Sequence, residues 1–186
     1  MTGRVLVVTG PGGAGKTTLA TAVAERLGWV LLSEDEAWVA HGWSGLRTPE
    51  QEAIVQAEVG AAMLAATEGG DGVVIELILY RPPPNPVTAY RDLLRTHRVP
   101  HAAVVLRPSV DEIVRRMAER GRPTDLADLD GRRRDAEWQH AVIDAGRSDG
   151  TIDPDEVIDP TGRAVDELVD DCVARLGLDR RGGQRG

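Results

Sequence analysis

A glycine-rich segment near the start of the chain constrains the fold more than any other feature of the sequence. Residues 10–17, GPGGAGKT, match G-x-x-x-x-G-K-S/T at every fixed position, after the apolar run 5–8 and before a helical pattern that starts at Lys16. Glycines here let successive main-chain N–H groups turn toward one anion, and the helix start adds partial positive charge. A glycine-rich turn without a ligand is the alternative. Because motif and setting agree, the segment predicts a phosphate-binding loop (P-loop) for a nucleoside triphosphate.

Two side chains of this segment carry specific expectations. The Lys16 ammonium should reach the β- and γ-phosphates, and the Thr17 hydroxyl should ligate Mg²⁺. The expected cofactors are therefore ATP or GTP together with Mg²⁺. The residues predicted to bind the nucleotide through this loop are Gly10, Gly12, Gly13, Ala14, Gly15, Lys16, Thr17 and Thr18.

Strand and helix patterns alternate along the rest of the chain. Short apolar runs predict strands at 5–8, 30–32, 73–79, 102–106 and 157–158. Apolar periodicity and capping residues predict helices at 16–27, after Thr48, from 85 through 94, from 109 to 121, at 137–144 and over 165–176. This alternation predicts an α/β protein with the three-layer P-loop NTPase fold: a five-stranded parallel sheet with helices on both faces. We expect one domain at 1–178, with an arginine-bearing lid at about 115–136, and a disordered tail at 179–186.

Composition narrows the class of partner. The 186 residues suit one domain, and the apolar runs are too short to span a membrane. The N-terminus lacks the pattern of a secretory signal, and the single cysteine, Cys172, excludes an internal disulfide. These features predict a cytoplasmic location. Because the net charge is −8 while arginines gather between 115 and 134, we expect a small anionic ligand and no nucleic acid.

Four further segments lie at the ends of predicted strands, in the same order along the chain as in a known family. An acidic run, Ser33-Glu34-Asp35-Glu36, follows the second predicted strand, and Glu76 follows the apolar residues 73–75 of the third. Arginines follow the fourth strand, and Asp159-Pro160-Thr161-Gly162 follows the fifth. The sequence contains no N-K-x-D-like segment and no long apolar run ending in Asp-Glu. The chain resembles the small P-loop kinases of the nucleoside-monophosphate, shikimate and gluconate kinase group, especially the chloramphenicol phosphotransferase-like and zeta-toxin-like branches, over most of residues 3–177.

The resemblance implies roles for the acidic residues. Asp35 fits the family's Ser-x-Asp and would take the proton from the acceptor hydroxyl, ahead of Glu34 and Glu36. A solvated acidic loop is the alternative. Glu76, where family members often carry Asp, would bind Mg²⁺ through water or bind the acceptor. Its alternative is a surface acid at a strand end.

The resemblance also implies an arginine lid over the triphosphate. Arg120 and Arg122 would contact the transition state, because guanidinium stays charged and grips phosphate oxygens in pairs. Arg115 or Arg116 would flank the adenine, and the loop at Pro160 would wrap it. For each arginine the alternative is a solvated helix face. Three further arginines are expected on the exterior, with the alternative that one of them swings in with the lid: Arg132, Arg133 and Arg134.

Aromatic residues near the two acidic segments predict an acceptor pocket, since aromatic walls with a few polar groups suit an organic molecule of medium size. In a chain without Phe, core filling is the alternative for each Trp. Trp29 and Trp138 are expected to pack in the interior. The residues predicted to bind the acceptor, or to lie beside it, are Asp35, Trp38, His41, Trp43, Glu76, Tyr80, Arg81 and the prolines 82–84.

The leading hypothesis is an ATP- or GTP-dependent O-phosphotransferase that acts on a hydroxyl of a small organic molecule, with inactivation of an antibiotic as a credible role. A nucleoside or sugar kinase is the nearest alternative. A second hypothesis is a nucleotide-dependent binding or regulatory module with little turnover, and a third is a polynucleotide 5′-hydroxyl kinase, which the acidic charge disfavours. The sequence leaves open the acceptor, the choice of base and whether the protein is a monomer or a homodimer.

Overall fold

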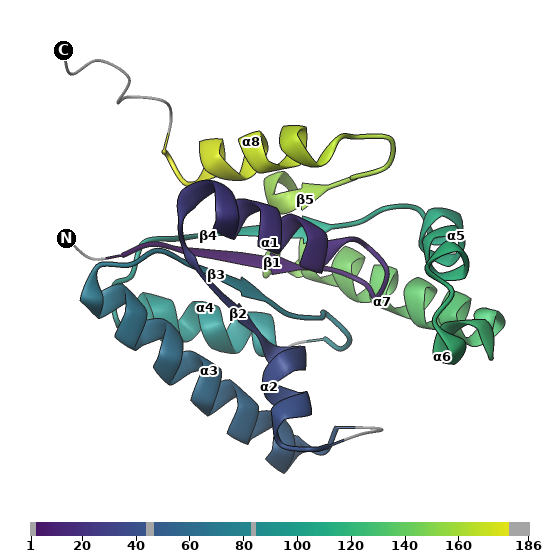
Figure 1. The fold of residues 1–186 in the computed structure, drawn as a ribbon, viewed down its shortest axis with the longest axis horizontal. Coiled ribbons are helices and arrows are strands. Elements are labelled where there is room, and N and C mark those ends of the chain that lie inside the picture. Colours follow the sequence, from purple (N-terminus) through teal and green to yellow (C-terminus); the bar gives the residue numbers. More distant parts are fainter. Residues whose placement is uncertain (1–2, 44–46, 83–84, 179–186) are drawn as a thin grey trace.

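A single parallel sheet organises the molecule (Figure 1). The computed structural model describes residues 3–43, 47–82 and 85–178. The strand order is β2-β3-β1-β4-β5, and Val7 of the central strand faces Ile75 on one side and Ala103 on the other. β1 is buried on both faces, which explains its unbroken apolar run. The strands are β1 (Val5–Thr9), β2 (Val30–Ser33), β3 (Val73–Glu76), β4 (His101–Leu106) and β5 (Val157–Ile158).

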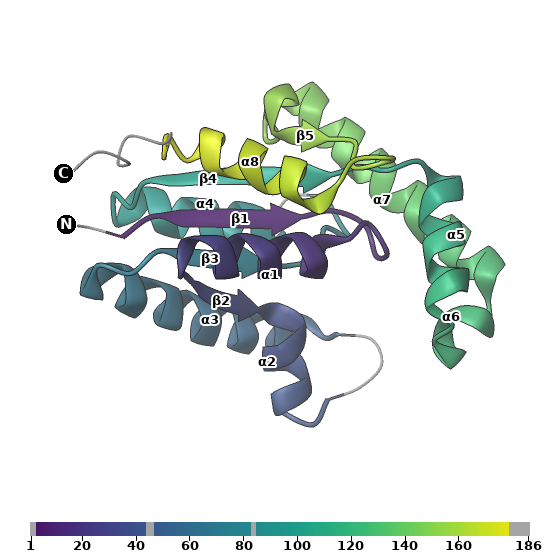
Figure 2. The same ribbon diagram turned by 45° about the horizontal axis from the view of Figure 1, so that its top comes forward.

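Helices cover both faces of this sheet (Figures 1 and 2). On one face, α1 and α8 bury Leu19 and Val169 against Leu6 of β1. On the other, α3, α4 and α7 bury Met63 and Ile143 in a second cluster. The predicted three-layer fold is thereby confirmed. The helices are α1 (Lys16–Leu27), α2 (Glu34–Ala40), α3 (Pro49–Gly69), α4 (Pro86–Thr96), α5 (Val110–Arg120), α6 (Pro123–Leu126), α7 (Leu129–Asp149) and α8 (Val165–Arg175), with a 3-10 turn, η1 (Pro154–Glu156).

Local capping fixes several helix ends where the sequence predicts them. Thr48 and Asn85 form reciprocal capping boxes at the starts of α3 and α4, and Ser109 accepts a hydrogen bond from the Glu112 N–H in α5. At the other ends, Gly28 and Gly121 adopt left-handed backbone with φ of 65° and 69°. A residue with a Cβ is strained in that conformation, so glycine stops α1 and α5.

Two predicted boundaries are wrong. The third strand ends at Glu76 rather than at 79, although the Leu77 and Leu79 N–H groups still donate to the carbonyls of Val8 and Gly10. Its sheet pairing stops because β1 turns away into the P-loop. The helix predicted at 137–144 begins at Leu129, where Asp128 caps it, and runs to Asp149. Its first turns are charged and show no apolar period, so the pattern fails there. The predicted tail, 179–186, lies outside the described residues.

In the part of the chain that the structure describes, no helix combines the length and the apolar character that crossing a membrane requires.

The parallel sheet brings the predicted functional segments to one edge. The P-loop, α2 and Glu76 all follow the carboxyl ends of neighbouring strands, and α5 follows the carboxyl end of β4. Figure 2 shows α5, α6 and the start of α7 standing beyond this edge. Ligands of open α/β sheets bind at such an edge, so the fold itself indicates where to look for a site.

Candidate active site

The P-loop adopts a conformation that glycine makes possible. Gly13 and Gly15 have φ of 78° and 97°, and Gly15 leads into α1. Lys16, the first residue of α1, is 7% exposed, and its Nζ donates to the Pro11 carbonyl at 2.9 Å. Gly10 serves packing: a Cβ there would lie 2.4 Å from the Leu106 carbonyl oxygen. The loop therefore holds its lysine against the main chain beside a row of amides.

A cavity of about 720 Å³ opens over this loop. It brings together nearly all the predicted P-loop residues, the acids Asp35 and Glu76, and several lid arginines. Gly10 and the predicted acceptor residues Trp38, Trp43, Tyr80 and Arg81 are not among its lining residues. The side chains and loop segments that line it and concern the chemistry are Gly12 through Thr18, Asp35, Glu76, Arg116, Arg120, Arg122, Asp125, Arg132, Pro160 and Arg163.

Glu76 lies at the floor of the cavity and connects β3 to the P-loop. It is 5% exposed; its Oε1 accepts a hydrogen bond from Thr17 Oγ1 at 3.2 Å and its Oε2 accepts one from Ser33 Oγ at 3.0 Å. These hard oxygen donors fit Mg²⁺, which proteins usually hold through one or two side chains together with substrate phosphates. Thr17 and Glu76 are therefore the residues suited to hold the metal.

The surroundings of Lys16 hold the pKa of its ammonium below the ordinary value. Burial lowers the pKa of the Lys16 ammonium, and Arg120 lowers it further, whereas Glu76 and Asp35 raise it. A phosphate arriving in the cavity would add negative charge next to Lys16 and so favour its charged form. The site thus has a cation whose charge is supported by the ligand that it is expected to bind.

The structure distinguishes the two arginines that spacing alone left open. Arg116 lines the cavity, and its Nη1 donates to the carbonyl of Ala14 at 3.2 Å in the P-loop. Its Nη2 reaches the Pro160 carbonyl at 3.5 Å. Arg115 points outward, where it pairs with Glu112 and Glu119. Arg116 is therefore the one placed to contact a nucleotide.

The lid arginines are organised around one buried acid. Asp125 of α6 pairs with Arg120, and Arg132 Nε lies 3.6 Å from its Oδ1. The expectation that Arg132 lies on the exterior is wrong: α7 begins early enough to turn this side chain into the cavity. Arg133 and Arg134 do lie outside, in ion pairs with Asp111 and Asp128.

Besides Asp125, two other polar residues at or beside the cavity have no counterpart in the sequence predictions. Arg163, after β5, lines the cavity and pairs with Asp171 at 2.9 Å. Gln139 of α7 is 7% exposed, and its Oε1 accepts a hydrogen bond from the P-loop N–H of Gly12 at 3.0 Å. Since 127 positions separate Gly12 from Gln139, no local pattern announces this contact.

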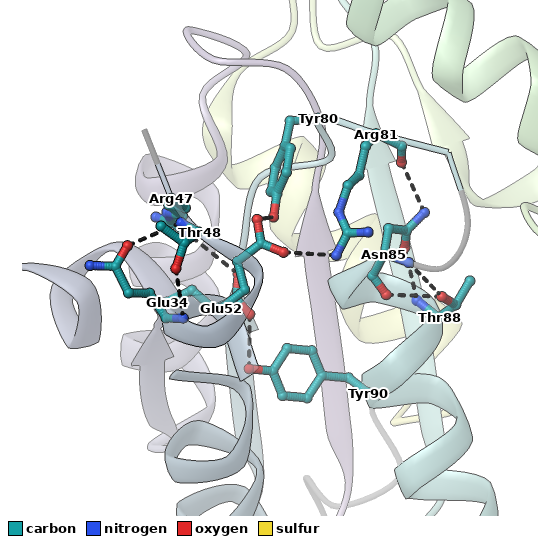
Figure 3. Close-up of polar contacts among 10 residues, drawn as sticks. Glu34, Arg47, Thr48, Glu52, Tyr80, Arg81, Asn85, Thr88 and Tyr90 are labelled. Atoms are coloured by element: carbon teal, nitrogen blue, oxygen red, sulfur yellow. Dashed lines mark hydrogen bonds and ion pairs between the residues drawn. The ribbon is translucent and has the colours of Figure 1, made fainter. Parts of the chain in front are cut away.

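The acidic run after β2 divides into different environments. Asp35 faces the cavity with a side chain that is 59% exposed, and it pairs with Arg47. Glu34 is buried and accepts a hydrogen bond from the Tyr90 hydroxyl at 2.9 Å (Figure 3). Glu36 is exposed and does not line the cavity. Helical geometry explains the difference, because consecutive residues of α2 point in different directions.

The predicted aromatic wall does not form as expected. Trp38 is 6% exposed within the core cluster, so it packs rather than faces an acceptor. Trp43 is half-buried between Trp38 and the His41 ring, which stacks on it at 4.2 Å. In contrast, Trp138 is 56% exposed and donates from Nε1 to the Tyr80 carbonyl, which corrects its assignment to the interior; Trp29 does pack against the core.

Tyr80 and Arg81 converge on Glu52 of α3 (Figure 3). The Tyr80 hydroxyl donates to Glu52 Oε1, and Arg81 Nη2 donates to Oε2 at 2.7 Å. Burial and the Glu52 hydrogen bond raise the pKa of Tyr80 to about 12. The segment predicted to bind the acceptor is thus held together by paired charges. The prolines at 83–84 lie outside the described residues.

The chain is similar to one family of known sequences and to several solved structures. A family model for an AAA domain matches residues 5–145. No curated protein matches the chain. Among solved structures, a gluconokinase from Sinorhizobium meliloti 1021 shares 20% identity at a TM-score of 0.57, covering 94% of this chain and 92% of that one.

Two other solved structures are similar over nearly their whole length. The tunicamycin resistance protein of Deinococcus radiodurans has a TM-score of 0.65 at 16% identity and 94% and 96% coverage of this chain and that one. The Mycobacterium tuberculosis APS kinase, solved with AMPPNP and APS, has a TM-score of 0.62 at 17% identity and 95% and 98% coverage. These likenesses show that the chain has the fold of small P-loop kinases, as the resemblance predicted.

Proposed function

The chain belongs to the AAA domain family, and from that premise we propose that it is a Mg²⁺-dependent phosphotransferase that moves the γ-phosphoryl group of ATP to a hydroxyl of a small organic molecule. The observation that carries the proposal is the composition of one cavity. The P-loop, the Thr17–Glu76 pair, the Asp35 carboxylate and the lid arginines all line it. These are the parts that phosphoryl transfer requires.

Each group has a step in the proposed reaction. Asp35 accepts the proton of the acceptor hydroxyl as its oxygen forms a bond to the γ-phosphorus. The bond between that phosphorus and the bridging oxygen of ADP breaks, so the products are a phosphate ester, ADP and a proton held at Asp35. Lys16 and the lid arginines Arg120, Arg122 and Arg132 offset the charge that spreads over the phosphoryl oxygens. Mg²⁺, held by Thr17 and Glu76, would neutralise part of the phosphate charge.

Nucleotide choice and location rest on different observations. The AMPPNP bound to the APS kinase relative supports ATP over GTP as the donor. We further propose a cytoplasmic location, which rests on the sequence features named above and not on the structure. The acidic balance of the chain supports a small-molecule acceptor rather than a polynucleotide.

The relatives support two acceptor classes. The tunicamycin resistance protein favours an antibiotic hydroxyl, and the gluconokinase favours a sugar or sugar acid. The acceptor side of this chain presents Arg47 and Arg81, but both are paired with carboxylates. Because these two charges beside the cavity are neutralised by their carboxylate partners, the predicted acceptor segments favour a molecule with hydroxyl groups and little charge, which keeps the antibiotic first and the sugar kinase second.

The test is phosphoryl transfer from ATP labelled at the γ-phosphate to a fixed panel: chloramphenicol, tunicamycin, uridine, D-glucose, D-gluconate and APS. At least one compound should gain the label and the mass of one phosphoryl group. Asp35→Asn should abolish this transfer. Release of label only as inorganic phosphate, with no labelled compound in the panel, would contradict the transferase proposal. It would favour instead a nucleotide-dependent module with little transfer.

A further inference from the structure

A buried carboxyl that the proposed reaction does not use lies next to Asp35. Glu34 is 1% exposed, although Asp35 and Glu36 beside it are exposed. Its Oε1 accepts the Tyr90 hydrogen bond, whereas its Oε2 is buried without a hydrogen-bond partner among the described residues. Burial of an incompletely paired carboxyl is costly. The position therefore suggests that this acid is kept for a purpose other than packing.

Arg47 connects this buried acid to the proposed base. One terminal nitrogen of Arg47 pairs with Asp35, and the other lies 3.7 Å from Glu34 Oε2. The guanidinium also lies over the Trp38 ring, 4.9 Å from its centroid, and its side chain is only 17% exposed. A planar fork with five N–H donors can serve two carboxylates at once. Arg47 is thus the group that Glu34 and Asp35 share.

We propose that Glu34 is a positioning residue whose negative charge anchors Arg47, which in turn holds the Asp35 carboxylate where it accepts the proton of the acceptor hydroxyl. The proposal rests on the proposed function, because it assigns Asp35 the role of base. When Glu34 is neutral, the contacts that hold Arg47 among the described residues are those with the exposed Asp35 and the Trp38 ring. Asp35 then samples more orientations, and transfer slows because the base is less often aligned.

The surroundings of Glu34 bring its charge change into the neutral range. Burial, together with the smaller effects of the charges of Asp35 of α2 and Glu52 of α3, raises the pKa of Glu34 to about 7. The hydrogen bond from Tyr90 of α4 and the charge of Arg47 act in the opposite direction. Ionisation of Glu34 should therefore increase kcat as pH rises through neutrality.

The experiment compares pH profiles of kcat for four proteins: wild type, Glu34→Gln, Tyr90→Phe and the exposed control Glu25→Gln. Each is assayed with MgATP and the panel compound that the wild type phosphorylates fastest. The wild type and the control should show a rise centred near neutrality. Glu34→Gln should lack this rise and stay about 10-fold below the wild-type plateau. Tyr90→Phe should keep the plateau but move the rise to higher pH, because the lost hydrogen bond favoured the ionised form.

Calorimetry of MgATP binding separates positioning from general damage. Glu34→Gln should bind MgATP as the wild type does; loss of binding would mean that Glu34 supports the whole site and would overturn the proposal. If Glu34→Gln does not fold, the shift expected for Tyr90→Phe decides alone. Transfer by the wild type with unshifted profiles in both variants would refute this inference and leave the proposed function standing. Absence of transfer to every panel compound would refute the proposed function first.

Discussion

The predicted nucleotide side of the site and its predicted acceptor side are built by different means. On the nucleotide side, one continuous segment presents main-chain amides, and its conformation depends on glycines with positive φ. On the predicted acceptor side, the chain relies on side-chain pairs such as Asp35 with Arg47 and Glu52 with Arg81, drawn from separate segments, and of these residues only Asp35 lines the cavity. Backbone geometry fixes what the first side binds, whereas balanced charges leave the second adjustable. Substitutions on the nucleotide side should therefore impair nucleotide binding, and substitutions on the acceptor side should impair transfer, each without the other effect.

The largest difference between an effect on catalysis and an effect on nucleotide binding should come from Asp35→Asn. Loss of the proposed base should lower kcat by about 10²–10⁴-fold, because general base contributions are of that size. MgATP affinity should stay the same, since Asp35 belongs to the acceptor side. Steady-state kinetics with a panel acceptor, together with calorimetry, measure both quantities. A kcat within a factor of two of the wild type would remove Asp35 from the mechanism.

Glu34→Gln should change how stability depends on pH. The pKa of Glu34 in the folded protein is about 7, above its ordinary 4.5, so the fold holds this proton more tightly than the unfolded chain. The stabilisation that results is fully present below about pH 4.5 and is lost as the pH rises through about 7. The loss in the free energy of unfolding amounts to about 3 kcal/mol.

Urea unfolding at pH 4.5 and pH 8 measures this difference. The wild type should lose about 3 kcal/mol more of its free energy of unfolding than Glu34→Gln over this interval. Equal losses in the two proteins would show that Glu34 does not hold its proton in the fold. Such a result would also weaken the contrast between the two sides, because the acceptor side would then contain no carboxyl group whose ionisation is opposed by burial.

Glu76→Gln addresses the place where the two sides meet. Its carboxylate receives hydrogen bonds from Thr17 of the P-loop and from Ser33 beside α2. Removing the charge should raise the Mg²⁺ concentration needed for half-maximal activity by about 10–100-fold, the range found for groups that support metal sites. Activity measured against Mg²⁺ concentration at saturating ATP tests this. An unchanged Mg²⁺ requirement would assign Glu76 to the acceptor instead.

The smallest expected effect compares two neighbouring arginines of α7. Arg132→Ala should weaken MgATP binding about 5-fold, since Arg132 lines the cavity and a charged hydrogen bond contributes about 1 kcal/mol or more. Arg133→Ala should change binding by less than about 2-fold, because its ion pair with Asp111 is exposed. Equal effects of the two substitutions, measured by calorimetry, would mean that Arg132 contributes no more to MgATP binding than Arg133 does.

The parts that the sequence predicted well are governed by local rules. The P-loop, the helix starts at Thr48 and Asn85 and the stops at Gly28 and Gly121 each depend on a few consecutive residues. Alternating strands and helices then leave few arrangements for a parallel sheet. For these reasons the five strands and the nucleotide cradle could be predicted before any tertiary contact was known.

The parts that could not be predicted depend on contacts between distant residues. Whether Trp38 packs or faces a ligand depends on the direction of α2 over the core, and Trp138 is exposed because α7 turns it toward the Tyr80 carbonyl. Gln139 reaches the P-loop only in the folded chain. The pairing of Glu34 with Tyr90 likewise spans 56 positions. Composition and periodicity carry no information about such partners.

The most direct test of the account is calorimetric titration of MgATP into the wild type and into Lys16→Ala. The Lys16 ammonium lies buried beside the P-loop amides, so its removal should weaken binding by about 10–100-fold, because a hydrogen bond to a charged group contributes about 1.5–3 kcal/mol. A clear heat for the wild type and almost none for the variant is the predicted result. No heat in the wild type, or equal affinity in both proteins, would contradict a cavity built to hold a nucleoside triphosphate.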